Sequence, residues 1–303
     1  MPSAAASDAA VTMPWVTFLS DYGLDDHLVG VCKGVMAGIA PQARVIDVCH
    51  QVPAQSVGIG ARLLHEALPW LPAGVHLALV DPLRPGMVRP VAIRCGNGST
   101  FVCPDNGVSS LSWSDLGGVT AARELTNSAL WHPKPARSFR GRDVFAPVAA
   151  HLAAGLDLEE VGDRIEPSDL VALHPRAPFV HGDHVHGTVE MVDHFGNLQL
   201  NIARADLEAS GIALGDTVEL RYGGKAMQVL FTLNFGDVAA GRTFVYEDSF
   251  RAITVLTTMG RADLTLGAKP GDPMVLSRVP QGALPGPTEK VKVVDWPPSA
   301  GTA

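Results

Sequence analysis

The sequence predicts an α/β N-terminal domain, with a mainly parallel sheet flanked by helices, followed by a smaller β-rich C-terminal domain. The chain has 303 residues and is 47% hydrophobic, which is enough to bury a sizeable core in one large or two ordinary domains. In the first half, apolar β-type runs alternate with stretches of helical periodicity. After "LHPRAPFVHGDHVHG" the helical periodicity fades, and strand-like segments joined by Gly-rich turns follow.

The N-terminal elements are expected in the following order. A strand at "WVTFLS" ends in the acidic turn "DYGLDD" and is followed by a helix at "HLVGVCKGVMAGIA". A strand at "ARVIDVC" precedes a helix at "SVGIGARLLHEALPWL", for which Ser56 is the expected N-cap. Further strands are expected at "GVHLALV", "RPVAIRC" and "STFVC", and a further helix at "VFAPVAAHLAAGL". Strands that alternate with crossover helices predict a parallel sheet with helices on its faces.

The second half is predicted to form strands at "TVEMVDHFGNLQLNI", "TVELRYGGKAMQVL", "RTFVYED", "AITVLTT" and "PMVLSRV". We therefore expect an N-terminal domain at 15–175, a Pro-containing linker at 173–182 and a C-terminal domain at 183–290. The Ala/Ser-rich start (1–14) and the end (291–303) are expected to be loose tails.

Composition argues against several classes of protein. The net charge of -8 and the lack of Lys/Arg runs argue against nucleic-acid or anionic-membrane partners. No apolar run reaches the ~18 residues that span a bilayer, and the N-terminus lacks the features of a secretory signal. The four cysteines fit no zinc motif and are expected to be buried free thiols in a cytoplasmic protein.

Three loops that leave expected strand ends contain Asp: "SDYGLDD", "VDPLRPG" and "CPDNG". Ligands bind at the carboxyl ends of strands in such sheets. Asp21, Asp25 and Asp26 either cap the following helix or accept hydrogen bonds from ribose hydroxyls or an ammonium group. Asp81 ends an apolar strand, so it needs a hydrogen-bond partner or cation, such as Arg84 or Arg89 in a structural pair, or else a functional role.

Three further patterns leave alternatives open. His181, His184, His186 and His194 are either a conceivable zinc site or solvated linker histidines. In "DHFGNLQLNI", Asn197 either presents an amide to a ligand or belongs to a hairpin turn. In "SFRGRD", two arginines flank Gly141, a layout that suits holding an anion or a carboxylate.

Taken together, these stretches resemble the S-adenosylmethionine (SAM) hydroxide adenosyltransferase family and its halogenating relatives, the fluorinase and chlorinase. The matching segments are "FLSDYGLDDHLVGVCKGVMAGIAP", "VIDVCH", "VDP", "CPDNG", "SFRGRDVFAPVAAHLA", "DHFGNLQLNI" and "TFVYEDSF". The resemblance implies a β-barrel-like C-terminal domain and a homotrimer, with each ligand between the N-terminal domain of one subunit and the C-terminal domain of its neighbour. It implies attack on the ribose C5′ of SAM with release of methionine, with SAM as substrate and no metal or other cofactor.

The resemblance also implies roles for individual residues. Asp21 matches the residue that binds the ribose hydroxyls, and Asp26 the residue near the methionine amine. Phe139 falls near the reacting carbon. The remaining substrate-binding positions are Asn197 at the nucleoside, Ser249 with Phe250 at the methionine end, and Met259 at the adenine edge.

The sequence departs from the family pattern at the catalytic positions. The hydroxide-transferring members use an Asp, an Arg and a His. Asp81 matches the Asp, the Arg falls on Val88 with Arg89 adjacent, and the His falls on Arg140. Gly141 stands where the fluorinase has its halide-binding Ser. The implied function is hydrolysis of SAM to adenosine and methionine; adenosyl transfer to halide or another small anion, or binding without turnover, are the alternatives.

Overall fold

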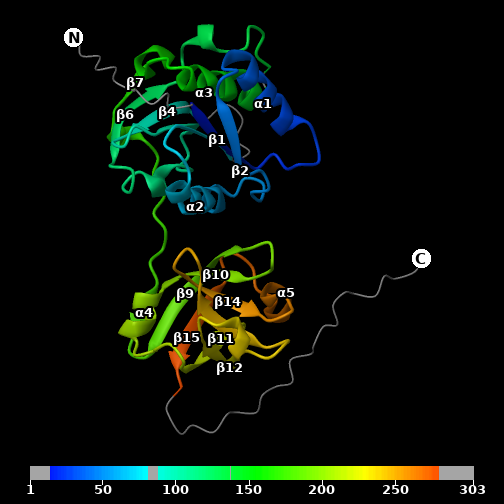
Figure 1. Cartoon of the computed structure of the whole chain (residues 1–303). Helices are drawn as coiled ribbons and strands as arrows, with labels where there is room; N and C mark the ends of the chain where they lie inside the picture. The colour runs from blue at the N-terminus through cyan, green and yellow to red at the C-terminus, as the bar shows by residue number, and fades with distance from the viewer. Residues whose placement is uncertain (1–13, 81–87, 137, 280–303) are drawn as a thin grey trace, which may run out of the picture. The chain divides into compact units, whose positions relative to one another are not determined.

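The computed structural model describes residues 14–80, 88–136 and 138–279. The described residues form two compact units, and the boundary between them in the sequence falls between His174 and Pro175 (Figure 1). Both expected tails lie outside the described residues, except for Pro14, and so do Asp81 and Arg84.

The N-terminal unit is built on a sheet that has seven strands within the described ranges, in the order β2-β1-β3-β5-β4-β6-β7. The strands are β1 (Trp15–Ser20), β2 (Arg44–Cys49), β3 (Val75–Leu79), β4 (Pro90–Cys95), β5 (Thr100–Pro104), β6 (Val119–Glu124) and β7 (Arg164–Ile165). β2, β1, β3 and β5 are parallel, whereas β4, β6 and β7 join antiparallel. The α/β class is confirmed, and the sheet is mixed because a short turn joins β4 to β5, which permits only antiparallel pairing.

Helices cover both faces of this sheet (Figure 1). They are α1 (Leu28–Ile39), α2 (Val57–Ala67), α3 (Ala146–Ala153), a π-helical turn at Gly141–Phe145, and 3-10 turns at Leu68–Trp70, Ser110–Ser112, Ser128–Leu130, Leu158–Val161 and Pro167–Asp169. Phe18 and Leu77 pack on the side of α1 and α3, whereas Leu19 and Ala78 face the α2 side. This alternation follows from the two-residue period of a strand. Ser56 is the N-cap of α2 as expected, although its side chain makes no capping hydrogen bond.

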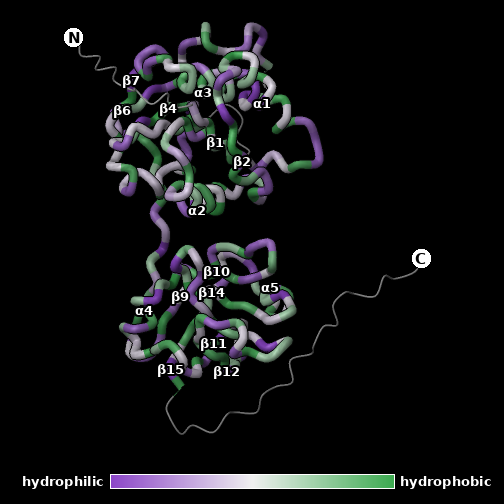
Figure 2. Tube along the Cα trace, in the orientation of Figure 1, coloured by the Kyte–Doolittle hydropathy of each residue, from purple (hydrophilic) through white to green (hydrophobic). Residues whose placement is uncertain are grey.

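The C-terminal unit is a closed barrel. Its strands run β10-β14-β13-β12-β11-β15-β9-β8, and β10 also pairs with β9, which closes seven of them. The elements are β8 (Phe179–His181), β9 (His184–Val192), β10 (Leu198–Ala203), α4 (Arg204–Ala209), β11 (Thr217–Tyr222), β12 (Lys225–Phe231), a 3-10 turn (Phe235–Asp237), β13 (Thr243–Glu247), β14 (Ala252–Thr257), α5 (Ala262–Leu266) and β15 (Pro273–Arg278). The predicted barrel is confirmed. Figure 2 shows hydrophobic segments along its strands, which enclose a core that includes Val185, Leu198 and Phe231.

One segment differs from the sequence prediction. Phe179–His181, expected within the linker, forms β8, an edge strand paired with β9. Gly182 turns the chain with a φ of 59°, so a two-residue turn joins the two strands. The ordered connection between the units is therefore shorter than the composition suggests.

Candidate functional site

The loop that follows β1 is held at the carboxyl ends of β2 and β3. The Asp21 amide donates to Leu79 O (3.2 Å), and the Gly23 amide donates to His50 O (2.7 Å). The Asp21 carboxylate accepts a hydrogen bond at Oδ2 from the Gln55 amide (2.9 Å). Gln55 has a φ of 64°, a backbone conformation that residues other than glycine rarely adopt. The hydrogen bond from Gln55 to Asp21 is therefore made at an energetic cost. Within the described ranges Asp21 Oδ1 accepts no hydrogen bond, so it is the oxygen available to a ligand.

The other two acidic residues of the loop are exposed. Asp26 Oδ1 accepts a hydrogen bond from the Leu28 amide (2.8 Å), at the start of α1. Asp26 therefore accepts from the first amide of α1, although His27 occupies the N-cap position and makes no side-chain capping hydrogen bond. A carboxylate has a second oxygen, so this contact does not prevent Asp26 from binding an ammonium group.

The segment "SFRGRD" contains two arginines with different partners. Arg142 donates from Nε to Asp143 Oδ1 (2.6 Å) and from Nη2 to Oδ2 (2.8 Å). Asp143 is fully buried and also accepts from the Ala136 amide (2.7 Å). The hydrogen bonds from Arg142 lower the pKa of Asp143 despite its burial. Arg142 therefore holds the turn in shape, as its place beside Asp143 in the sequence suggests.

Arg140 contacts Val88, the other position at which the sequence is expected to depart from the family pattern. Its Nη1 donates to Val88 O (3.1 Å), and its guanidinium lies 5.6 Å from the centroid of the Phe145 ring. The guanidinium of Arg140 therefore lies beside the backbone at Val88. Asp81, the expected partner of this charge, lies outside the described residues.

Arg89 is engaged in a structural ion pair. It donates to Asp105 Oδ2 from Nε (3.1 Å) and Nη2 (2.6 Å), and to Asp169 O from Nη2 (2.7 Å). Asp105 is buried, and its other oxygen accepts from the Val171 amide (2.9 Å). The structural pair considered for Arg89 is present, but its acid is Asp105 of the "CPDNG" loop.

Tyr22 is a residue of this edge that the sequence analysis did not single out. A Cβ on Gly141 would overlap the Tyr22 hydroxyl and lie 3.3 Å from Leu79 Cδ1. The Tyr22 ring meets the Phe139 ring edge to face, with centroids 5.9 Å apart. Tyr22, Phe139 and Gly141 therefore form one packed group beside the ends of β1 and β3. The position of Tyr22 directly after Asp21, in a strand-end loop, was the available signal.

The C-terminal candidates lie in turns of the barrel. Asn197 is buried, and its amide N and Nδ2 donate to Asp193 (2.9 and 2.7 Å) in the β9–β10 turn. Gly196 has a φ of 83°, and a Cβ there would meet the side chains of Arg261 and Asp263. The hairpin reading of "DHFGN" is thus realised. The turn also fixes the Asn197 amide in one orientation, with Asp193 as the residue that sequence reasoning missed.

Ser249 and Phe250 lie in the β13–β14 turn, and Met259 follows β14 with a φ of 51° and 89% exposure. The β13–β14 turn is organised by Asp248, which, like Tyr22 and Asp193, sequence reasoning missed. The carboxylate of Asp248 accepts four hydrogen bonds, from the Phe250 amide (2.8 Å), the Ala252 amide (3.0 Å), Gln199 Nε2 (2.7 Å) and Thr254 Oγ1 (3.0 Å).

The structure does not gather these candidates at one point. By strand register, the turns containing Asn197 and Met259 lie at one end of β14, and Ser249 lies at the other. The rise of a strand separates the two ends by about 20 Å. The candidates of the barrel therefore lie at the two ends of β14.

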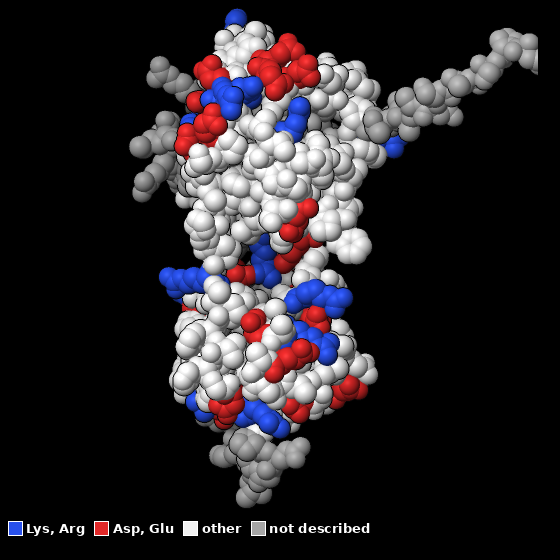
Figure 3. Space-filling model, turned by 90° about the vertical axis from the view of Figure 1, so that its left-hand side faces the viewer, with Lys and Arg blue, Asp and Glu red and all other residues white. Residues whose placement is uncertain are grey.

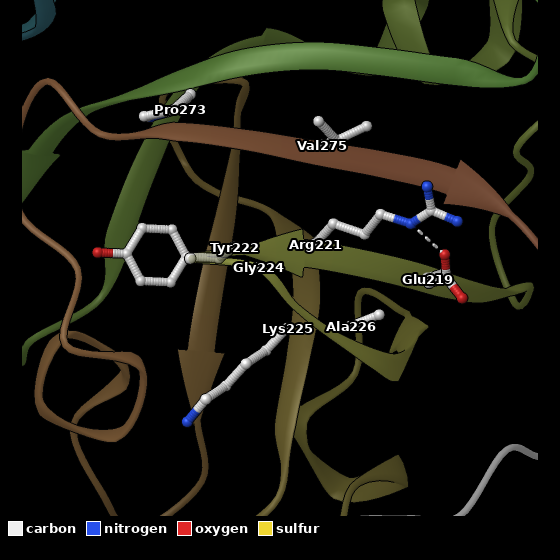
Figure 4. A pocket seen from close by; sticks show the side chains of 9 residues that line it. Glu219, Arg221, Tyr222, Gly224, Lys225, Ala226, Pro273 and Val275 are labelled. Carbon is white, nitrogen blue, oxygen red and sulfur yellow. Dashed lines mark hydrogen bonds and ion pairs between the residues drawn. The ribbon is translucent and has the colours of Figure 1, made fainter.

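A hollow elsewhere on the barrel contains none of the predicted residues. Its lining comes from the β11–β12 hairpin and β15, and includes Arg221, Tyr222, Lys225 and Val275 (Figure 4). Arg221 is paired there with Glu219 (2.5 Å), and the Tyr222 hydroxyl donates to Asp272 (2.7 Å). This hollow is not the predicted site.

The histidine group gives no metal centre in the part of the chain that the structure describes: no three His, Cys, Asp or Glu side chains are arranged to hold an ion. His184 and His186 share a face of β9, and their rings are 6.3 Å apart. His184 Nδ1 lies 2.7 Å from Asp183.

The cysteines, the surface charge and the helix lengths are the features on which the predicted exclusions depend. All four cysteines are free, and burial raises the pKa of Cys32 to about 12. On the face drawn in Figure 3, basic and acidic side chains are interspersed. Within the described ranges, no helix is long and apolar enough to cross a membrane.

Proteins named SAM hydrolase or fluorinase are similar in sequence to this chain over most of its length. A protein of Salinispora tropica named (R)-S-adenosyl-L-methionine hydrolase is 44% identical over 86% of this chain and 96% of its own length. One of the same name from Thermus thermophilus is 38% identical over 86% of this chain and 98% of its own length. A fluorinase of Nocardia brasiliensis is 30% identical over 70% of this chain and 78% of its own length.

A solved structure of an uncharacterized conserved protein from Thermotoga maritima superposes with a TM-score of 0.81 at 36% identity, covering 87% of this chain and all of that one. Residues 16–162 match the SAM hydroxide adenosyltransferase N-terminal domain, and residues 187–275 match the C-terminal domain of the same family. Since the two matches follow each other in order and span most of both units, the chain belongs to the SAM hydroxide adenosyltransferase family.

Proposed function

We propose that this protein is a SAM hydrolase, in which water attacks the ribose C5′ to give adenosine and L-methionine. The observation that supports this best is the difference among its relatives. The hydrolases of Salinispora tropica and Thermus thermophilus match at higher identity and over more of their own length than the fluorinase of Nocardia brasiliensis does. The packing of Tyr22 over Gly141 adds to it, because it leaves no room for a side chain at the position of the fluorinase Ser.

The described geometry suits the proposed binding roles. Asp21 Oδ1 can accept from a ribose hydroxyl while Oδ2 keeps its bond to Gln55. Asn197 presents a fixed side-chain amide for the nucleoside, and Ser249 presents an exposed hydroxyl for the methionine end. Asp26, Phe139, Gly141, Phe250 and Met259 complete the proposed substrate contacts.

The proposed chemistry needs little from the protein beyond alignment and a proton acceptor. The water oxygen bonds to C5′ as the C5′–S bond breaks, and the electron pair of that bond goes to sulfur. The sulfonium leaves as a neutral thioether, so no general acid is required. The proton lost by the attacking water goes to Asp81, the proposed base, and then to solvent.

Arg140 is proposed to supply the positive charge that the family Arg and His would provide. A cation near Asp81 keeps that carboxylate ionised and ready to accept a hydrogen bond from water. Arg140 itself cannot act as a base, because a guanidinium group is not deprotonated in proteins and has no hydrogen-bond acceptor. Because the Arg89 guanidinium is paired with Asp105, we propose a structural role for Arg89 in holding the "CPDNG" loop. In this role Arg89 does not contact the reacting atoms.

The quaternary arrangement belongs to the proposal as well. We place the site between the N-terminal unit of one subunit and the C-terminal unit of its neighbour in a homotrimer. Phe250 and Met259 are 48% and 89% exposed in the single chain, which favours a ligand or neighbour that covers them. A cytoplasmic location is proposed from the free cysteines.

Chromatography of the products tests the proposed function. Purified protein is incubated with SAM in halide-free buffer, and again with chloride or bromide, beside an Asp81→Asn control. Adenosine from the wild type alone supports hydrolysis, whereas product that appears only with halide would indicate adenosyl transfer.

The replacement of the family His by Arg140 favours one further candidate, a SAM-binding protein without turnover. Thermal stabilisation by SAM without any product would support that candidate.

A further inference from the structure

A chain of polar side chains runs from the surface of the N-terminal unit to the loop that contains Asp21. Lys33 Nζ donates to Asp47 Oδ2 (2.9 Å), and Asp47 Oδ1 lies 3.2 Å from His50 Nε2. His50 Nδ1 lies 2.8 Å from Ser20 Oγ. Ser20 is fully buried and His50 is 5% exposed, while Asp47 reaches solvent. Asp47 and His50 belong to "VIDVCH", a segment that the proposed mechanism does not use.

The partners define the direction of these contacts. A proton on His50 Nε2 faces the Asp47 carboxylate at ion-pair distance, although off the line of a regular hydrogen bond. The lone pair on Nδ1 then accepts the Ser20 hydroxyl proton, as the second nitrogen of such an imidazole does. Ser20 Oγ in turn lies 3.4 Å from the Tyr22 amide, which donates to it. The Phe18 ring, 4.6 Å away, meets the imidazole edge to face and limits its rotation.

A Ser–His–Asp set invites comparison with a nucleophilic triad, but the burial excludes that role. A nucleophile must reach its substrate, and Ser20 has no exposed surface on a strand in the interior of the unit. The Ser20 hydroxyl also accepts a hydrogen bond from the backbone amide of Tyr22. The set therefore acts on the protein itself.

The residue between these contacts is Asp21. On one side, Ser20 is bound through its side chain to His50. On the other side, the Gly23 amide donates to His50 O (2.7 Å). One residue, His50, thus holds both flanks of Asp21, and Gln55 holds its carboxylate from across the loop.

We propose that His50 and Ser20 are positioning residues that set the Asp21 carboxylate for the ribose hydroxyls, with Asp47 orienting the imidazole. This inference rests on the proposed function, because it needs Asp21 to bind the ribose. The ligand class is a nucleoside with free 2′- and 3′-hydroxyls, and the contact that His50 serves discriminates against a deoxyribose.

The test measures the ratio of Kd values for 2′-deoxyadenosine and adenosine by titration calorimetry on the full chain. For the wild type we expect a ratio above about 10, since a carboxylate left without its hydroxyl partner costs at least that factor. Asp21→Ala should bring the ratio to within about threefold of unity. His50→Gln keeps a nitrogen near Asp47 but removes the acceptor for the Ser20 hydroxyl. Ser20→Ala removes the hydroxyl itself. Both should lower the ratio at least about fivefold and raise the KM for SAM more than they lower kcat.

Two further variants make the test specific. His50→Asn places an amide oxygen near the position of Nδ1, so it should retain the ratio within about twofold. The matched control is Thr17→Val, which deletes the other buried hydroxyl–imidazole contact of β1, Thr17 Oγ1 to His76 Nδ1 (2.8 Å), away from the loop. It should leave the ratio unchanged. If His50→Gln does not fold, Ser20→Ala decides, because it removes a single oxygen atom.

The outcomes separate this inference from the function beneath it. A ratio that falls in Asp21→Ala but stays at the wild-type value in Ser20→Ala and in folded His50→Gln would overturn the positioning role and leave the proposed function intact. An equal fall in Thr17→Val would also overturn it, by showing a general packing effect. A ratio insensitive to Asp21→Ala would overturn the positioning role together with the proposed ribose contact of Asp21, whereas absence of adenosine in the product analysis would overturn the proposed function.

Discussion

The hydroxyl of Tyr22 occupies the space that a Cβ on residue 141 would need. The two residues are far apart in sequence, and they meet because the loop after β1 and the π-helical turn before α3 lie at the same edge of the sheet. The glycine of "SFRGRD" is therefore required by its neighbour, and the pair determines the shape of this edge.

The first prediction concerns this pair. Gly141→Ala should lower the free energy of unfolding by about 1–3 kcal/mol, because the added methyl group forces the Tyr22 ring to move. In the background of Tyr22→Leu, the same change should cost at least about 1 kcal/mol less, because the shorter side chain leaves space. Urea unfolding of the four proteins measures this coupling. Additive effects would show that the two residues do not constrain each other.

The second prediction concerns Arg140 and its contact with Val88. Arg140→Met should lower kcat for SAM hydrolysis by about 10²-fold, since the cation beside the proposed base is lost. Val88→Arg in the same background should recover much of the rate, because it returns a guanidinium to the segment that Arg140 reaches. Arg62→Met, on the opposite face of the sheet, is the control and should retain activity. Failure of Val88→Arg to recover any rate would show that Arg140 acts by its own geometry, beyond its charge.

The third prediction tests the shared site. Asp21→Ala and Asn197→Ala each lie in a different unit, and each should be nearly inactive alone. If sites form between neighbouring subunits, hybrids from co-expression of the two variants contain some sites in which both units are intact. Random assembly makes these about a quarter of all sites. Activity near that fraction in the unsorted mixture, and near about one third in purified hybrid trimers, each of which has one such site, supports the arrangement. Hybrids as inactive as the two parents would contradict it.

The fourth prediction concerns His76, which is buried in β3 with its Nδ1 against Thr17 Oγ1. Burial lowers the pKa of His76 to about 4. The unfolded chain binds a proton at this residue below pH ~6.5, whereas the folded chain does not until pH ~4. Stability should therefore be complete above pH ~6.5 and fall by about 3 kcal/mol as the pH drops to ~4.

Replacing both partners, in Thr17→Val/His76→Leu, leaves no unpaired polar group and should flatten this part of the pH dependence. The measurement is the difference in unfolding free energy between wild type and variant at pH 7.5 and at pH 4.5. An equal slope in both proteins would show that His76 does not bind a proton differently in the two states.

The sequence identified most of the elements because their periodicity is strong. Helix α1 and strands β1 and β3 have long apolar patterns, and several barrel strands, such as β11 before Gly223 and Gly224, end at glycine-containing turns. Elements with weak signals were missed, namely β6, whose "VTAARE" is half polar, the two-residue β7, and the short helices α4 and α5 of the C-terminal unit. β8 was assigned to the linker because Phe179 and His181 are flanked by Pro and Gly, and only its pairing with β9 reveals it as a strand.

The candidate site was predictable where chemistry follows local sequence. Asp21 at a strand end, Arg142 beside Asp143 and the Asn197 turn could all be read from neighbouring residues. The contacts of Tyr22 with Gly141, Arg140 with Val88 and His50 with Ser20 join segments at least 30 residues apart. No local pattern indicates such contacts, because they depend on the order of strands in the sheet.

The most direct test of the central claim is to run the reaction in halide-free buffer made with ¹⁸O-labelled water. The adenosine product is then analysed by mass spectrometry, beside an Asp81→Asn control. Attack of water on C5′ predicts one ¹⁸O atom in the 5′-hydroxyl of adenosine from the wild type and little product from the control. Absence of adenosine, or adenosine without the label, would contradict the proposed hydrolysis at C5′.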